Sequence, residues 1–129
     1  MRVVAAVIQD KETFLACRRA PHKSLAGKWE FPGGKVEPLE TDEEALEREI
    51  LEELGVEVTI EQFLIETTQN QGESTIEMFT YLSRLVAERP IQSSDHDQMK
   101  WLPLNELSQY DWAELDVPVI ERLQEIFNT

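Results

Sequence analysis

Basic residues, cysteine and long apolar runs are all scarce in this chain of 129 residues. Lys and Arg number 12 against 26 Asp and Glu, which gives a formal net charge of −14. Such a protein lacks the broad cationic surface that nucleic-acid binding needs. A polyanionic ligand would need divalent cations in order to approach it. We therefore expect no nucleic-acid partner.

The shortage of cysteine and of apolar runs narrows the class of protein further. Cys17 is the only cysteine, which excludes an internal disulfide and a thiolate metal cluster. The longest apolar run, Val3 to Ile8, is far too short to cross a bilayer and is unlike a secretory leader. The apolar share of 41% is typical of a globular chain. We expect one cytoplasmic domain, residues 1–129, with no membrane partner.

Hydrophobic patterning predicts a mixture of strands and helices. Runs rich in β-branched and aromatic residues predict strands at 2–10, 13–19, 29–31, 56–68, 74–87 and 99–104. Short and terminal helices are expected at 104–110 and 116–127, a hairpin at 69–73, and a turn at "PGGK" (32–35). This order predicts an α/β (α+β) fold with a mixed sheet between helices.

The main helix is predicted between Thr41 and Gly55. Thr41, followed three residues later by Glu, has the capping-box pattern, and Gly55 is placed near the C-cap. From Glu40 to Glu57 there are nine carboxylates and a single basic residue, Arg48. Because like charges one turn apart destabilise a helix, either solvent or a bound cation should offset the repulsion.

Three of these carboxylates fall on one side of the predicted helix. At 100° per residue, Glu49, Glu52 and Glu53 share an arc of about 100°. An apolar stripe lies beside them and consists of Leu46, Ile50 and Leu54. Clustered hard oxygen ligands suit Mg²⁺ or Mn²⁺, and a carboxylate not engaged with a cation could act as general base for an attacking water. The alternative is a solvated acidic face.

The spacing around the cluster decides between these readings. Gly34 is followed after five residues by Glu40, and after seven more by R-E-I-L-E-E-L-G-V (48–56). The pattern is G-x5-E-x7-R-E-U-x-E-E-x-G-U, with U aliphatic, and it is complete at every position. This resembles the Nudix box. "RRAPHKSLAGKWEFPGGKVEP", "MKWLPLNEL" and "LDVPVIERL" are similar to MutT-type Nudix hydrolases, so the resemblance covers nearly the whole chain.

The resemblance implies a fold and an activity. Nudix hydrolases are α/β/α sandwiches with a mixed sheet, and they hydrolyse a nucleoside diphosphate linked to another group. MutT-type members convert nucleoside triphosphates to the monophosphate and pyrophosphate. The implied protein is thus an enzyme, a hydrolase of phosphoric anhydrides, with Mg²⁺ as cofactor and Mn²⁺ as a substitute. Its partner is a nucleotide, and both a monomer and a homodimer stay open.

The resemblance also implies roles for residues of the box. Glu52 and Glu53 match metal ligands, and Glu49 matches a ligand or a general base. The backbone carbonyl around Gly33 matches a further ligand. The other fixed positions match catalytic support or structure: Arg48, Glu40, Gly34 and Gly55.

A further metal ligand is implied near the last strand. Counting back from Trp101 places it on Asp95, with Asp97 as a substitute. His96, between the two aspartates, could approach a metal, but a lone loop histidine is more often solvated, and we expect that here.

Four residues are candidates for contacts with the substrate. Arg19 could bind phosphate through bidentate geometry and Lys35 as a point charge; ordinary surface charge is the alternative for both. Phe31 resembles the aromatic of the base pocket, although "WEF" could be a core strand. Asp116 aligns with the side chain that reads the base edge, and it also fits the N-cap of the terminal helix.

The preferred base stays open between two branches of the family. An ionised Asp116 only accepts hydrogen bonds, which suits cytosine N4 or the guanine N1/N2 edge. "LAGKWEF", "GGKVEP" and "LDVPVIERL" resemble CTP pyrophosphohydrolases, whereas Pro32 follows the MutT pattern. We expect clearance of oxidised or non-standard dNTPs, 8-oxo-dGTP first, with CTP, dCTP or 5-hydroxy-dCTP as the alternative.

Two rival classes remain. Removal of pyrophosphate from RNA 5′ ends is disfavoured by the negative charge. A non-catalytic nucleotide-binding Nudix module would be expected to lose box glutamates, and all are present here.

Overall fold

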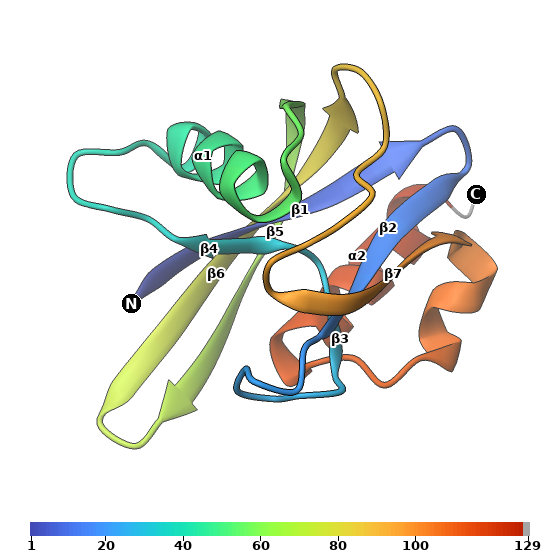
Figure 1. Cartoon of the computed structure of the whole chain (residues 1–129). Coiled ribbons are helices and arrows are strands. Elements are labelled where there is room, and N and C mark those ends of the chain that lie inside the picture. Colours follow the sequence, from blue (N-terminus) through green and yellow to red (C-terminus); the bar gives the residue numbers. More distant parts are fainter. Residues whose placement is uncertain (128–129) are drawn as a thin grey trace.

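The computed structural model describes residues 1–127, in which seven strands form one mixed sheet (Figure 1). Its central strands run in the order β3-β2-β1-β6-β5, while β4 also pairs with β1 and β7 with β2. The parallel pairing of β1 with β6 makes the sheet mixed. The strands are β1 (Arg2–Asp10), β2 (Thr13–Arg19), β3 (Trp29–Glu30), β4 (Gly33–Lys35), β5 (Val58–Gln71), β6 (Ser74–Leu85) and β7 (His96–Pro103).

One helix covers each face of the sheet (Figure 1), which confirms the predicted sandwich. Side chains of β1 alternate between the faces, as the pleat of a strand requires. Val4, Ala6 and Ile8 pack under α1 (Asp42–Leu54). Ala5 and Val7 belong to the core under α2 (Val117–Phe127). The short 3-10 helices η1 (Leu104–Gln109) and η2 (Glu114–Asp116) precede α2.

The acidic helix α1 is fixed at both ends. The Thr41 hydroxyl accepts from the Glu44 N–H, and the Glu44 carboxylate accepts from the Thr41 N–H, so the predicted capping box is confirmed. Gly55 ends the helix at φ 69°, in the left-handed region that glycine adopts without strain. Asp42, in the first turn, accepts from Arg2 of β1 and from the Tyr81 hydroxyl of β6.

The main error of the sequence reading concerns "PGGK". Residues 33–35 form strand β4, which pairs with Val3, Val4 and Ala5 of β1. A Cβ on Gly33 would collide with the Val4 carbonyl, so the absence of a side chain there lets two backbones approach closely. Glycine was taken as a turn signal, whereas here it permits close strand pairing.

Element boundaries differ elsewhere by a few residues. The predicted hairpin at 69–73 is confirmed, but β5 extends to Gln71, three residues beyond the prediction, and β6 ends at Leu85. β7 begins at His96, three residues early, because it pairs with β2 along its length. The helix expected at 104–110 is a 3-10 helix. Residues 128–129, the end of the predicted domain, lie outside the described residues. None of the helices in residues 1–127 combines the length and apolar character needed to cross a bilayer.

The capping box gives a stability prediction. Thr41→Ala removes the acceptor for the Glu44 N–H and should lower the free energy of unfolding by about 1 kcal/mol, measured by urea denaturation at 25 °C. Thr59→Ala, at an exposed position of β5, is the matched control and should change it by less than about 0.5 kcal/mol. Equal effects of the two substitutions would contradict a capping role.

Candidate active site

A pocket of about 440 Å³ opens beside β4 and is lined by residues from several separate parts of the chain. Its volume is in the range of ligand pockets. One group of lining residues consists of glycines and carboxylates, which we call the carboxylate end because the charge of Asp95 acts on Glu53: Gly33, Gly34, Glu53 and Asp95. A second group, which we call the apolar end, consists mainly of apolar and aromatic residues around one carboxylate: Phe31, Met78, Trp112, Leu115 and Asp116.

Glu53 is the α1 carboxylate that faces this pocket. It lies at the edge of the apolar stripe predicted from the helical spacing, and it is only 8% exposed. Its Oε2 atom has no hydrogen-bond partner within residues 1–127. Burial, followed by the negative charges of Asp95, Glu49 and Glu30, raises the pKa of Glu53 to about 9. A protein has little structural reason to bury an unpartnered carboxyl group among other carboxylates.

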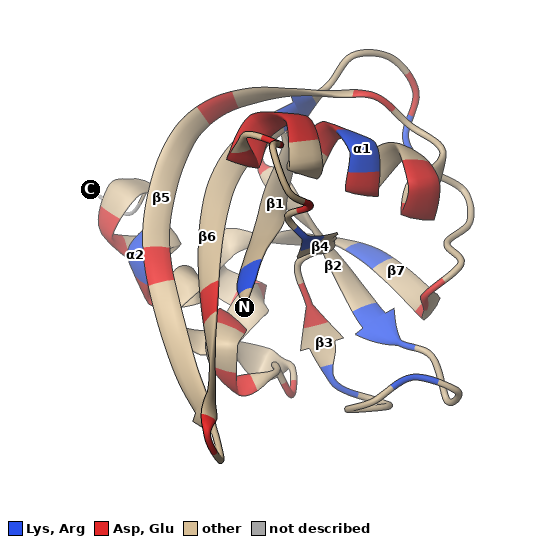
Figure 2. Cartoon of the chain, turned by 90° about the vertical axis from the view of Figure 1, so that its left-hand side faces the viewer, with Lys and Arg blue, Asp and Glu red and all other residues tan. Residues whose placement is uncertain are grey.

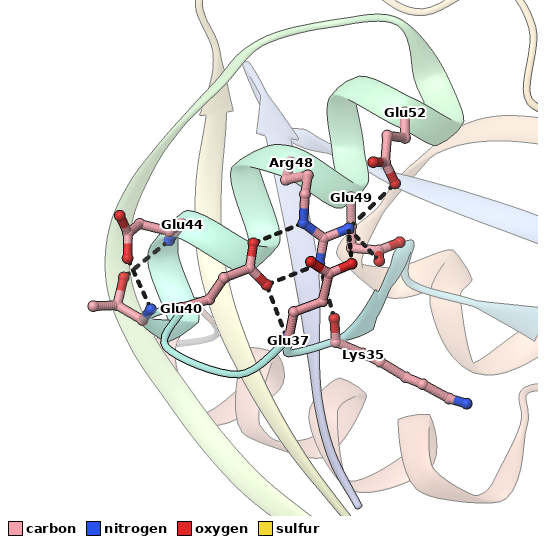
Figure 3. Close-up of polar contacts among 8 residues, drawn as sticks. Lys35, Glu37, Glu40, Glu44, Arg48, Glu49 and Glu52 are labelled. Atoms are coloured by element: carbon pink, nitrogen blue, oxygen red, sulfur yellow. Dashed lines mark hydrogen bonds and ion pairs between the residues drawn. The ribbon is translucent and has the colours of Figure 1, made fainter.

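Arg48 binds two carboxylates of α1 and one from the segment before the helix (Figure 3). Its Nε and Nη2 donate to the two oxygens of Glu40, at 2.7 and 2.9 Å. Its Nη1 donates to Glu49 at 2.9 Å and to Glu52 at 3.2 Å, and Nη2 also reaches the backbone carbonyl of Lys35. The guanidinium therefore links the helix to the strand and loop before it.

Glu40 and Gly34 owe their places in the motif to this network. The hydrogen bonds from Arg48, joined by the Glu37 N–H, lower the pKa of Glu40 to about 2, so this carboxylate stays ionised. A Cβ on Gly34 would collide with the Glu49 carboxylate. Glycine at 34 thus leaves room for Glu49 between the helix and β4.

Asp95 and Asp97, the two alternatives from the sequence, point to different partners. Asp95 lines the pocket and its charge acts on Glu53. Burial opposes its ionisation, but the Ser94 hydroxyl and the Lys23 ammonium hold the pKa of Asp95 below its usual value. Asp97 is instead held by Arg18 through two hydrogen bonds of 2.7 and 2.8 Å. Only Asp95 shares the pocket with Glu53.

The donor chemistry of the carboxylate end fits a hard divalent cation. Glu53 and Gly33 both line that end of the pocket. Glu53 offers an oxygen without a hydrogen-bond partner in residues 1–127 and has a raised pKa, and Gly33 offers its backbone. No three His, Cys, Asp or Glu side chains in residues 1–127 are grouped closely enough to hold one ion together. In this arrangement Glu49 and Glu52 are both hydrogen-bonded to Arg48.

The two candidate phosphate contacts differ in placement. Arg19 lines the pocket and is 20% exposed at its side chain. Lys35 does not line it: its backbone carbonyl accepts from Arg48, and the drawn side chain extends away from the acidic cluster (Figure 3). The structure brings Arg19, but not Lys35, into the pocket with Glu53.

Phe31 and Asp116 meet at the apolar end. The Phe31 ring lies against Trp112, with 4.6 Å between ring centroids. Asp116 is 4% exposed, and its Oδ2 accepts from the Phe31 N–H at 2.9 Å. Burial, opposed by that hydrogen bond and increased by the charge of Glu30, raises the pKa of Asp116 to about 8. The sequence suggested an N-cap for Asp116, but its hydrogen bond goes to a strand 85 residues away.

The sequence did not identify Glu30 and Trp112 as residues of the site, and the surroundings predicted for His96 were wrong. Glu30 lines the pocket, and its carboxylate binds both Arg19 and His96. His96 was expected in a solvated loop, but its side chain is fully buried at the start of β7. A carboxylate between two aromatics in "WEF" was the available signal for Glu30. Trp112 was expected only as a core or interface aromatic.

Acidic residues crowd α1 (Figure 2). Arg48 is the one basic residue in the sequence of this helix.

The NUDIX domain family model matches residues 1–123. A CTP pyrophosphohydrolase of Escherichia coli is 33% identical over 121 residues, covering 94% of this chain and 89% of the relative. An 8-oxo-dGTP diphosphatase of Proteus vulgaris is 48% identical over 60 residues, covering 46% of this chain and 54% of the relative. The crystal structure of a MutT protein from Methanosarcina mazei Go1 superposes with a TM-score of 0.85, at 26% identity, over 99% of this chain and 95% of that one.

The buried carboxyl of Glu53 predicts a pH-dependent penalty on stability in EDTA. The folded protein keeps this proton up to about pH 9, whereas the unfolded chain loses it near the ordinary value of 4.5. The free energy of unfolding is therefore unaffected by Glu53 below pH 4.5 and falls as the pH rises towards 9. Glu53→Gln should thus be more stable than wild type at pH 8 by at least about 1 kcal/mol, with no difference at pH 4.

Urea denaturation across this pH range measures the effect. Glu52→Gln, at a side chain that is 60% exposed, is the matched control and should give a curve parallel to wild type. Adding Mg²⁺ should stabilise wild type and narrow its gap to Glu53→Gln. A Glu53→Gln curve parallel to wild type at all pH values would contradict the buried, proton-retaining carboxyl.

Proposed function

Since the chain belongs to the Nudix family and is a MutT-like nucleoside triphosphate pyrophosphohydrolase, we propose that it clears oxidised or non-standard dNTPs, with 8-oxo-dGTP as the leading substrate. The observation that supports this most is the division of a single pocket. Carboxylates and glycine backbone lie at one end, and stacked aromatics around a buried carboxyl at the other. A nucleotide spans such a pocket with its phosphates at the first end and its base at the second.

The phosphate end supplies cation ligands, and Arg19 supplies positive charge. Glu53 and Asp95, with Glu52 and the backbone at Gly33, would hold Mg²⁺, or Mn²⁺ in its place. Such an ion neutralises charge on the phosphate oxygens and favours attack by water. Arg19 supports binding of the phosphates, since it lines the same pocket.

Two carboxylates of α1, Glu53 and Glu49, have different roles in this proposal. Glu53 has one oxygen without a hydrogen-bond partner in residues 1–127, and its proton must leave before it can bind a cation. Glu49 retains a bond to Arg48, which orients it, while burial holds its pKa above the usual value. A carboxylate of raised pKa close to the phosphates is suited to accept the proton of the attacking water. We assign that role to Glu49, and the positioning of Glu49 and Glu52 to Arg48.

The base end supports a purine with a mixed hydrogen-bonding edge. With a pKa of about 8, Asp116 is mainly protonated at neutral pH. A protonated carboxyl donates one hydrogen bond and accepts others, as an amide does. An oxidised guanine presents both donors and acceptors on one edge, so the neutral Asp116 suits it better than the ionised form would. Phe31 and Trp112 provide aromatic surface for the ring.

Cytosine nucleotides are the second candidate, because the relative matched over most of the chain is a CTP pyrophosphohydrolase. The N4 amine of cytosine would be recognised by an ionised Asp116, which only accepts. The two candidates therefore differ in the protonation state that they require at one residue.

The proposed function is tested by pyrophosphate release with Mg²⁺ from 8-oxo-dGTP, dGTP, CTP, dCTP and 5-hydroxy-dCTP. We expect the highest kcat/KM for 8-oxo-dGTP. Glu53→Gln should lose at least about 100-fold in kcat while retaining its circular dichroism spectrum, because a cation ligand is removed. A lead for the cytosine nucleotides would assign the protein to the second candidate, and no release from any of them would contradict both.

The protonation of Asp116 predicts a pH-dependent base preference. The ratio of kcat/KM for 8-oxo-dGTP to that for dCTP should fall as the pH rises through about 8, where Asp116 loses its proton. Asp116→Asn keeps a donor and an acceptor at every pH, so its ratio should stay constant from pH 6.5 to 9.5. The same pH dependence in Asp116→Asn would show that another group is responsible.

A further inference from the structure

His96 is a fully buried histidine with both ring nitrogens engaged. Its Nε2 lies 2.8 Å from the Glu30 carboxylate and its Nδ1 lies 2.7 Å from the Ser93 hydroxyl. An ionised carboxylate only accepts, so Nε2 carries the hydrogen. The Ser93 hydroxyl accepts from the Asp95 N–H and can donate to Nδ1, so both ring nitrogens have a partner.

The Glu30 carboxylate that binds His96 also binds Arg19. The Arg19 Nη1 donates to both oxygens of the same carboxylate, at 3.0 and 3.1 Å. The other side of the guanidinium is fixed by Ser24, whose backbone carbonyl accepts from Nε at 2.5 Å and whose hydroxyl accepts from Nη2 at 3.3 Å. Of the five N–H groups of Arg19, one on Nη2 has no partner within residues 1–127.

Arg19 and Glu30 both line the pocket, whereas His96 does not. The charge of Glu30 acts on the pKa of Glu53 at the carboxylate end and on that of Asp116 at the apolar end, and Arg19 also acts on Asp116. In the proposed function, a nucleotide that spans the pocket therefore brings its phosphates near this ion pair.

We propose that His96 is a positioning residue: through Glu30 it sets the orientation of Arg19, so that the guanidinium presents its remaining N–H to a substrate phosphate. This inference rests on the proposed function, because it gives a role to the Arg19 of that site. His96 itself touches no substrate. It contacts Glu30 but does not line the pocket.

The arrangement also solves an electrostatic difficulty. A carboxylate in the path of a polyphosphate repels it unless its lone pairs are occupied. The two Arg19 bonds and the His96 bond occupy three of the roughly four lone-pair sites on Glu30. Without His96, Glu30 would keep only its bonds to Arg19, and the two side chains could turn together.

The first test is a double-mutant cycle on kcat/KM with the best triphosphate and Mg²⁺. His96→Ala should lower kcat/KM about tenfold, mainly through KM, and His96→Gln should recover most of the loss because its amide can still donate to Glu30. In an Arg19→Ala background, His96→Ala should have less than a twofold further effect. His22→Ala, at the exposed second histidine, is the matched control and should behave as wild type. Additive losses in the double variant, or failure of His96→Gln to recover activity, would overturn the proposal.

A second measurement does not depend on turnover. The Arg19 Nε–H signal, assigned in ¹H–¹⁵N spectra by its loss in Arg19→Lys, should be slow to exchange in wild type and in His96→Gln, and broadened in His96→Ala. Mn²⁺ affinity should be unchanged in His96→Ala, because Glu53 and Asp95 are left in place. An unchanged Arg19 signal in a folded His96→Ala protein would overturn the positioning role. If wild type released no pyrophosphate but the signal responded as expected, the proposed function would fail while the link from His96 to Arg19 would stand.

Discussion

The burial of a carboxyl group at the edge of an apolar helix face is the constraint on which the site depends. Packing of Leu46, Ile50 and Leu54 against the sheet fixes the rotation of α1. That rotation leaves Glu53 nearly inaccessible and close to Asp95. In the proposed function, the electrostatic cost of this placement favours cation binding, because a divalent ion would relieve repulsion that the folded chain cannot relieve by itself. The helix is acidic for a functional reason, although much of its charge is exposed.

Hydrogen bonds that anchor α1 stabilise the helix against this electrostatic repulsion. Asp42 at the first turn is tied to β1 and β6, and Arg48 in the middle is tied to the segment before the helix. These bonds connect the helix to the sheet at points away from Glu53. The proposed cation ligands are therefore held by packing and by neighbouring ion pairs, which is how functional groups in proteins are usually oriented.

The sequence predicted the part of the site that lies on one helix and missed the part that depends on long-range contacts. Glu40, Arg48 and Gly55 belong to a motif with fixed spacing within a continuous segment, and the observed bonds agree with that spacing. In contrast, Glu30 and His96 are 66 residues apart, and no local pattern pairs them. The register of β2 against β3 and β7 brings them together, and single-sequence periodicity does not determine register between strands. The misreading of Gly33 has the same origin, because its partner, β1, lies about 30 residues earlier.

The bond between Asp116 and the Phe31 N–H couples two tasks in one side chain. The carboxyl that faces the base also fixes the backbone just ahead of β4, where the phosphate end of the pocket begins. A substitution that adapts position 116 to a new base must therefore keep an acceptor for that N–H. Most substitutions of Asp116 that change the preferred nucleotide during evolution would also remove this acceptor and leave the Phe31 N–H without its partner. Diversification of specificity should then proceed more readily through Met78 and Leu115, which line the same end and whose side chains make no hydrogen bond within residues 1–127.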